Sequence, residues 1–155
     1  GFAEPSVAKL KIAAGVSLRT LYRHYPSKES MVIGALQHRH SRYLRFLADG
    51  EPDPGKESIA HLFLRLTAWM KKDAPNGCMS MSALVAFPRN SLIHDLVKHH
   101  KEEMVEVMAR RSGREDLARE LLLIHEGASA TWPLLGMQAI HSAEKPTLLL
   151  ICGEN

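Results

Sequence analysis

Side chains that can donate hydrogen bonds gather in one short segment near the start of the chain. The segment contains Ser17, Leu18, Arg19, Thr20, Tyr22, Arg23, His24 and Lys28. On the outer face of a helix, the basic and hydroxyl side chains of this segment can bind phosphate oxygens, and arginine can also bond the edges of bases. These residue types at this density therefore predict contact with nucleic acid.

Two short helices separated by a glycine would present this segment. An apolar side for the first helix is supplied by Val7, Ala8, Leu10 and Ala14. Gly15 is expected to end that helix, because glycine readily adopts the positive φ of a tight turn. Ser17 can cap the amides of a second helix, and Leu21, four residues further on, would face the core.

A third helix is predicted directly after the segment. Pro26 cannot continue the second helix, and Ser27 can cap the next one. The amides near Lys28 and Glu29 would then lie where a phosphate oxygen can bind. Residues 18–24 therefore lie between the start of the second helix, at Ser17, and the start of the third helix, at Ser27.

The run from Val7 to Glu29, VAKLKIAAGVSLRTLYRHYPSKE, resembles the DNA-binding head of the tetracycline-repressor (TetR) family of bacterial regulators. The resemblance implies a helix-turn-helix that enters the major groove of double-stranded operator DNA. It assigns groove contacts to Leu18, Arg19 and Thr20, and backbone contacts to Tyr22, His24 and Lys28. Lys11 and Ile12 depart from the family pattern. The family also places a whole helix before the equivalent of Gly1, so we expect this head to lack its first helix unless residues precede Gly1.

Charge is distributed unevenly along the 155 residues. Residues 1–50 carry eight Lys or Arg against three acids, a net charge of +5, whereas residues 51–155 carry twelve against fourteen, a net charge of −2. A basic head suits attraction to nucleic acid, although a solvated basic surface would have the same composition. Cys78 and Cys152 are too few and too far apart for a disulfide framework or a zinc site. With no long apolar run and no secretion signal, we expect a cytoplasmic protein with no membrane segment.

The remaining sequence predicts helices throughout. Apolar spacing and breaker residues indicate a helix from Ser27 to about Leu47, a loop over 49–55, and helices over about 56–72, 78–87 and 91–112. Ser91 is the expected cap of the last of these. A further helix passes Leu117 and Trp132 with a bend near Pro133, and a short one covers about 142–152. Because no segment alternates with period two, the fold class is all-α. We expect a head with its connecting helix over 1–47, fused to a helical regulatory domain over 48–155.

The second part of the chain also resembles the TetR-family regulatory domain, in Gly77-Cys78-Met79 and in the run from His125 to Ala128. The resemblance implies that the last two helices, over about 116–151, pair with their copies in a homodimer. The apolar run after Pro146 is only LLLIC, so we expect a short final helix and a weak dimer.

Large, soft side chains from several predicted helices form a candidate pocket for a small apolar effector. They are Trp69, Met70, Met79, Phe87, Met104, Met108 and Trp132, with His125 as a polar wall residue. An ordinary core uses the same residue types, so apart from the resemblance the core interpretation is the stronger one.

Other polar clusters carry weaker hypotheses. Asp95, His99 and Glu103 have helical spacing, but no second ligand pair converges on them, so a solvated face is preferred to a metal site. His125 with Glu126, or Cys78, lacks a catalytic partner motif, so no enzyme activity, metal or cofactor is predicted. Three basic residues follow the head, Arg39, Arg42 and Arg45. A polar outer face is preferred for them over extra phosphate contacts.

The sequence thus predicts a ligand-responsive transcriptional regulator, a repressor in the simplest case. A homodimer would hold two recognition helices one duplex turn apart, and an effector would shift the dimer away from that spacing. The alternative is a dimeric helical small-molecule sensor or interaction module that does not bind DNA.

Overall fold

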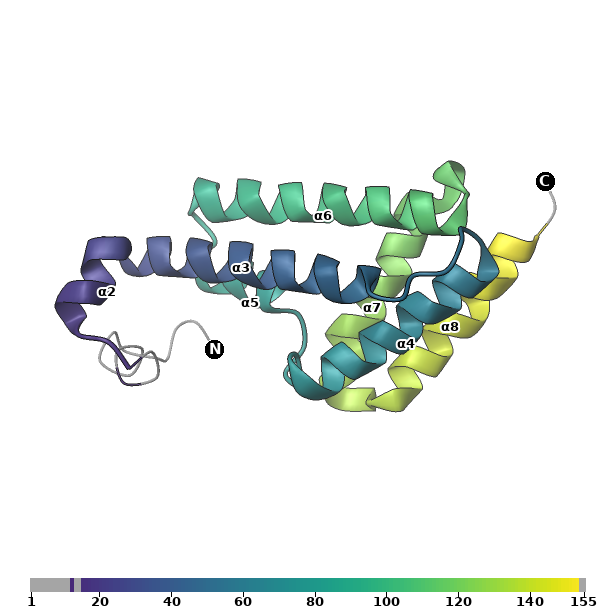
Figure 1. Ribbon diagram of the computed structural model, residues 1–155, viewed down its shortest axis with the longest axis horizontal. Coiled ribbons are helices and arrows are strands. Elements are labelled where there is room, and N and C mark those ends of the chain that lie inside the picture. The colour runs from purple at the N-terminus through teal and green to yellow at the C-terminus, as the bar shows by residue number, and fades with distance from the viewer. Residues whose placement is uncertain (1–11, 13–14, 154–155) are drawn as a thin grey trace. The chain divides into compact units, whose positions relative to one another are not determined.

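The computed structural model describes Ile12 and residues 15–153, and within this part of the chain it is helical, with no strand (Figure 1). The elements are α2 (Leu18–His24), α3 (Lys28–Ala48), α4 (Lys56–Lys72), α5 (Met79–Ala86), α6 (Ser91–Ser112), the 3-10 turn η1 (Glu115–Leu117), α7 (Ala118–Leu135) and α8 (Met137–Cys152). The all-α fold class is confirmed. None of the described helices combines the length and the apolar character needed to cross a membrane.

The helices are grouped in two compact units. The first unit combines the chain up to Ser41 with Met79–His99, and the second combines Arg42–Cys78 with the chain from His100 onward. The long helices α3 and α6 each contribute their first part to the first unit and their last part to the second. A division of function at residue 47, between a head and a regulatory domain, stays a prediction.

The first unit has a small core under α5. Val32 and Leu36 of α3 pack with Ala83 of α5 and with Ile93 and Val97 of α6. Ala83 is fully buried, and its small side chain lets the short α5 lie close to its neighbours. The apolar spacing predicted for α3 therefore does bury residues as expected.

The cap of α6 differs from the prediction. The side chain of Asn90 accepts a hydrogen bond from the amide of Ile93 at 3.1 Å, and Ser91 is already the first helical residue. Both residue types are strong caps, and they are adjacent in the sequence. The helix can begin after only one of the two residues, and here Asn90 is the cap.

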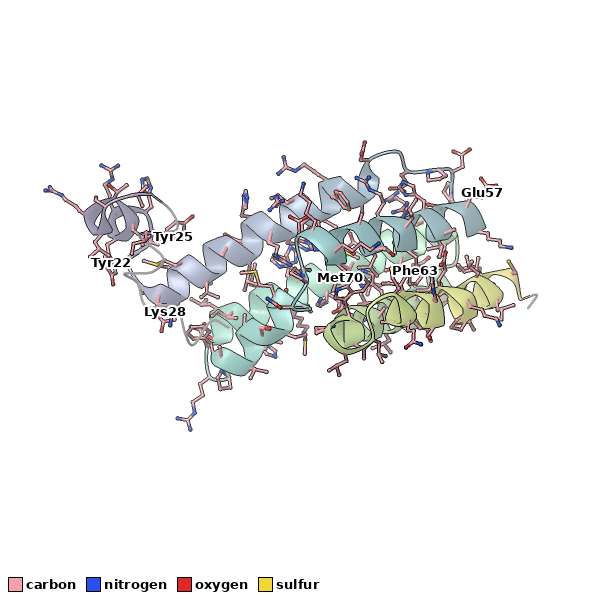
Figure 2. All side chains as sticks on the ribbon, turned by 90° about the horizontal axis from the view of Figure 1, so that it is seen from below. Tyr22, Tyr25, Lys28, Glu57, Phe63 and Met70 are labelled. Carbon is pink, nitrogen blue, oxygen red and sulfur yellow. The ribbon has the colours of Figure 1, made fainter. Side chains whose placement is uncertain are left out.

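The main core of the second unit is built on α4. Apolar residues of α4 pack against Ala128 of α7 and against Ile140 and Ala143 of α8. Figure 2 shows Phe63 and Met70 on the side of α4 that faces α8. A second cluster joins Leu47, Leu62, Met104, Met108, Ala118 and Leu121. The i, i+3, i+4 pattern read from the sequence of α4 is confirmed by this burial.

The final helix is longer than predicted. α8 begins at Met137, after Gly136, and runs to Cys152 with Pro146 inside it. A proline in a helix removes one hydrogen bond to the carbonyl four residues earlier. Pro146 and Ser142 are both exposed, so water can satisfy the carbonyl that is left over. The prediction of a short final helix, and of a weak dimer on that ground, was therefore wrong about the helix.

Candidate functional site

The turn before α2 has the geometry that the sequence predicted. Gly15 has a φ of +65°, and its amide donates to the carbonyl of Ile12 at 3.2 Å. A φ of this sign strains any residue with a Cβ, although the space around Gly15 is open. Glycine is therefore required here by the backbone and not by packing. The predicted contributions of Val7, Ala8, Leu10 and Ala14 lie outside the described residues.

Ser17 caps α2 as expected. Its Oγ accepts a hydrogen bond from the amide of Thr20 at 3.1 Å and lies 2.9 Å from the Thr20 hydroxyl. The cap satisfies one of the free amides at the helix start. Thr20 is also half-buried, and with its hydroxyl beside Ser17 it is less free to contact a partner than its exposed neighbours are.

The outer surface of α2 carries basic and aromatic side chains. Arg19, Arg23 and His24 are exposed, and no residue of α2 is buried. Leu18 and Tyr22 have 41% and 44% of their surface exposed, which is high for such large side chains. These side chains form an accessible face with donors and flat or apolar contact groups, and we call this face the α2 surface.

The junction between α2 and α3 is tightly built. Ser27 and Ser30 cap each other: each amide donates to the other side chain's oxygen, at 3.0 and 3.1 Å. The ring of Tyr25 lies directly on the backbone of Gly34, where an added Cβ would overlap it. Figure 2 shows Tyr22, Tyr25 and Lys28 around this junction. The contact holds the end of α2 against α3 within the first unit.

Lys28 is half-buried in the first turn of α3, next to the Ser27 cap. The Tyr25–Gly34 contact was not predicted, since no local pattern signals an aromatic ring packed on a glycine nine residues away. Ser27 itself was predicted as the cap, and the two hydrogen bonds confirm it.

A chain of polar side chains runs through the second unit. The Tyr43 hydroxyl lies 2.7 Å from Nε2 of His125, and Nδ1 of His125 lies 3.3 Å from a carboxylate oxygen of Glu126. Lys101 donates to the other oxygen of Glu126 at 2.7 Å, and its Nζ is 3.8 Å from the sulfur of Cys78. Four separate segments of the chain thus meet in one polar network.

The surroundings of Glu126 and Tyr43 fix the protonation states of both side chains. Burial would raise the pKa of Glu126, but hydrogen bonds and positive charge from His125 and Lys101 outweigh it and lower that pKa to about 2. Burial raises the pKa of Tyr43 well above its usual value, and the negative charge of Glu126 adds to the effect. Glu126 is therefore an anion and Tyr43 a neutral phenol at physiological pH.

The residues predicted to line an effector pocket fall into three clusters. Trp69, Met70, Trp132 and His125 belong to or adjoin the core built on α4. Met104 and Met108 belong to the second cluster of the same unit, and Met79 and Phe87 pack in the first unit. The structure thus groups the first four, and sequence reasoning missed Tyr43 and Lys101 as their polar neighbours.

Asp95 and His99 are exposed on α6, and Asp95 lies 3.6 Å from Nδ1 of His94. Glu103, two turns along the same helix from Asp95, is half-buried. Asp95 and His99 thus lie on a solvated face, as preferred from the sequence, whereas Glu103 does not, and the absence of a metal site stays a prediction.

Comparison with known structures identifies the architecture. A TetR-family transcriptional regulator from Streptomyces coelicolor superposes with a TM-score of 0.81 at 16% identity, over 98% of this chain and 89% of that one. The chain has the TetR fold. The crystal structure of a second protein, described as a TetR transcriptional regulator from Streptomyces avermitilis, matches with a TM-score of 0.74 at 24% identity, over 97% of this chain and 88% of that one. No protein-family model matches the sequence, and no curated protein is significantly similar to it.

Within the TetR fold, the α2 surface and the polar network occupy different compact units. The sequence resemblance, which covered Val7 to Glu29 most closely, and the fold comparison, which covers nearly the whole chain, therefore agree on a TetR-like fold.

Proposed function

We propose that this protein is a ligand-responsive transcriptional regulator that binds operator DNA as a homodimer through α2. The observation that carries the proposal is the α2 surface: a capped helix after a glycine turn, with three basic side chains and Tyr22 exposed on it. A helix of this kind fits the major groove of B-DNA, where arginine can distinguish bases. No catalytic role is assigned to any residue.

We assign the DNA contacts of α2 to two groups, those to base edges and those to the DNA backbone. Arg19, in the first turn, is assigned to a base edge, with Leu18 and Thr20 beside it. Tyr22, Arg23, His24 and Lys28 are assigned to phosphates and sugars, which fix the helix in register without reading sequence. The Thr20 hydroxyl already bonds Ser17, so its contribution is smaller than that of Arg19.

Dimer formation is assigned to α7 and α8. These helices leave large apolar side chains in solvent: Leu123 is 71% exposed, Leu134 85% and Leu149 66%. Exposed apolar side chains of this size on neighbouring helices favour burial against another surface. A second copy of the same helices would bury them in a symmetric contact.

Effector response is assigned to the polar network and its aromatic neighbours. Tyr43 lies on α3, the same continuous helix that begins at Lys28. A ligand that replaced the Tyr43–His125 hydrogen bond would act directly on this helix. It could shift the dimer between DNA-binding and released states only by its difference in affinity for the two. We infer that the protein represses transcription in the bacterial cytoplasm and that the ligand relieves this repression.

A gel-shift titration against the DNA flanking the protein's own gene tests the proposal. Specific binding that weakens steeply with salt is expected, because basic side chains displace counterions from phosphates. Lys71→Ala on the exposed face of α4 is the matched control and should leave binding unchanged. A protein that forms dimers but shifts none of this DNA at low salt would favour the alternative, a sensor or interaction module without DNA binding.

A further inference from the structure

A groove on the second unit is lined by two helical stripes that face each other. α3 contributes Arg42, Arg45 and Phe46, with Asp49 directly after its end, and α4 contributes Arg65, Ala68, Trp69 and Lys72, each set at the i, i+3, i+4, i+7 spacing. Asp73 completes the lining, and the cavity is about 460 Å³. This volume lies in the range of small-molecule sites.

The groove is basic. Four cationic side chains, Arg42, Arg45, Arg65 and Lys72, face only two carboxylates, so the lining carries a net charge of +2. This contrasts with the negative balance of residues 51–155 as a whole. A concave surface with such a local excess of positive charge attracts anions.

Two of the guanidinium groups are held in place. Arg42 pairs with Asp73 at 2.8 Å and lies 5.5 Å from the centre of the Trp69 ring. Arg65 pairs with Asp49 at 3.1 Å, donates through Nε to the carbonyl of Phe46, and lies 3.7 Å from the centre of the Phe46 ring. Because these bonds use Nε and Nη2 of Arg65, its Nη1 donors are left for a ligand. Fixed guanidinium groups lose little freedom on binding an oxyanion.

The carboxylates restrict the size of the anion. Asp49 and Asp73 lie at opposite ends of the two stripes, and the side chain of Asp49 is 77% exposed. A long polyanion that followed the groove would meet a negative charge at each end. A compact anion centred near Arg45, between the two ends, would lie away from both.

We propose that this groove binds a small phosphate-bearing molecule, with the phosphate between the arginines of α3 and α4 and Lys72. Guanidinium forks match the oxygens of a phosphate, and charge-assisted bonds to it are short and strong. The groove adjoins the polar network through Trp69, whose ring centre lies 4.9 Å from that of Tyr43, but its phosphate site does not depend on operator binding.

Isothermal titration calorimetry with inorganic pyrophosphate tests the groove. The wild-type protein should bind pyrophosphate, and Arg45→Gln with Lys72→Gln should weaken binding at least about tenfold, the effect of losing one charge-assisted hydrogen bond. Both side chains are exposed, so the fold should survive their replacement, which circular dichroism checks. Lys71→Gln, one residue from Lys72 and outside the groove, should bind as wild type does.

A variant with the opposite effect guards against loss of binding through unfolding. Asp49→Asn removes the negative charge from the rim, while Arg65 keeps its bond to the Phe46 carbonyl and can still donate to the amide oxygen of the new side chain. It should tighten pyrophosphate binding by about threefold, the scale of an exposed charge pair. The proposal is wrong if wild type binds no pyrophosphate at millimolar concentration, if the double variant binds equally well, or if Lys71→Gln weakens binding as much as the double variant does.

Discussion

The guanidinium of Arg111 donates a hydrogen bond to Nδ1 of His61 at 2.7 Å, inside the second unit. Arg111 is fully buried and also donates to the hydroxyl of Ser58 and to the carbonyl of Leu47. One side chain of α6 thus satisfies acceptors from the end of α3 and from the first two turns of α4.

Replacing this side chain should be costly. Arg111→Met keeps much of the volume but leaves the Ser58 hydroxyl and the Leu47 carbonyl buried without their donor. We expect the free energy of unfolding to fall by about 3 kcal/mol, the scale seen when one partner of a buried polar cluster is removed. Urea denaturation measures it, with Arg119→Met on the exposed face of α7 as the control. A loss as small as that of the control would contradict the role given to Arg111.

The same contact predicts a dependence of stability on pH. Burial, followed by the positive charge of Arg111, lowers the pKa of His61 below its usual 6.5, so the folded state holds this imidazole neutral. The unfolded chain binds the proton first as pH falls. The His61 contribution to stability is therefore present above pH 6.5 and is lost as pH falls below it.

His61→Gln should flatten this part of the stability profile, whereas His141→Gln on the exposed surface of α8 should not. Urea midpoints measured between pH 5 and pH 8 compare the three proteins. Equal slopes for wild type and His61→Gln would show that another group causes the loss.

Glu126 predicts a second pH effect at lower pH. Its pKa of about 2 lies below the usual 4.5, so its contribution to stability is complete above pH 4.5 and disappears as pH falls toward 2. Glu126→Gln should cost about 2 kcal/mol at neutral pH, since Lys101 and His125 lose a charged acceptor. Glu120→Gln, exposed on the same helix, serves as the control in thermal unfolding. An unchanged acid profile in Glu126→Gln would refute the assignment.

Two glycines should respond oppositely to alanine. Gly77 has a φ of +90°, and an added Cβ would lie 3.3 Å from Cγ of Pro133, so Gly77→Ala should destabilise by more than about 1 kcal/mol. Gly127 lies inside α7 with open space around it, so Gly127→Ala should stabilise by up to about 1 kcal/mol. Chemical denaturation of both variants provides the comparison, and a shift in the same direction for both would be inconsistent with these backbone conformations.

Local patterns predicted most of the helices but few of the contacts between them. The Ser17 and Ser27 caps, the loop after Ala48 and the apolar face of α4 follow from short-range signals, and the structure confirms them. The last helix was predicted to start near Ser142 but starts at Met137, directly after Gly136, and Pro146 is tolerated inside it because it is exposed. The cap at Asn90 was missed because its neighbour is an equally good cap.

The long-range contacts left no mark in the sequence. Tyr43 lies in a helix that was predicted from local apolar spacing, and its hydrogen-bond partner His125 is 82 residues away. The facing stripes of the groove that we propose to bind phosphate are of the same kind: Arg42 and Arg45 are exposed, as a polar outer face requires, but nothing in the sequence showed that they lie opposite α4.

We propose that α2 reads base pairs, and selection from a random duplex library with Arg19→Ala, Lys28→Ala and wild-type protein tests this most directly. Lys28→Ala should weaken binding to all duplexes about equally and keep the preferred sequence. Arg19→Ala should lose preference at one base pair, with a discrimination cost of about 1–3 kcal/mol. If Arg19→Ala retained both the affinity and the sequence preference of wild type, α2 would not be the element that reads DNA.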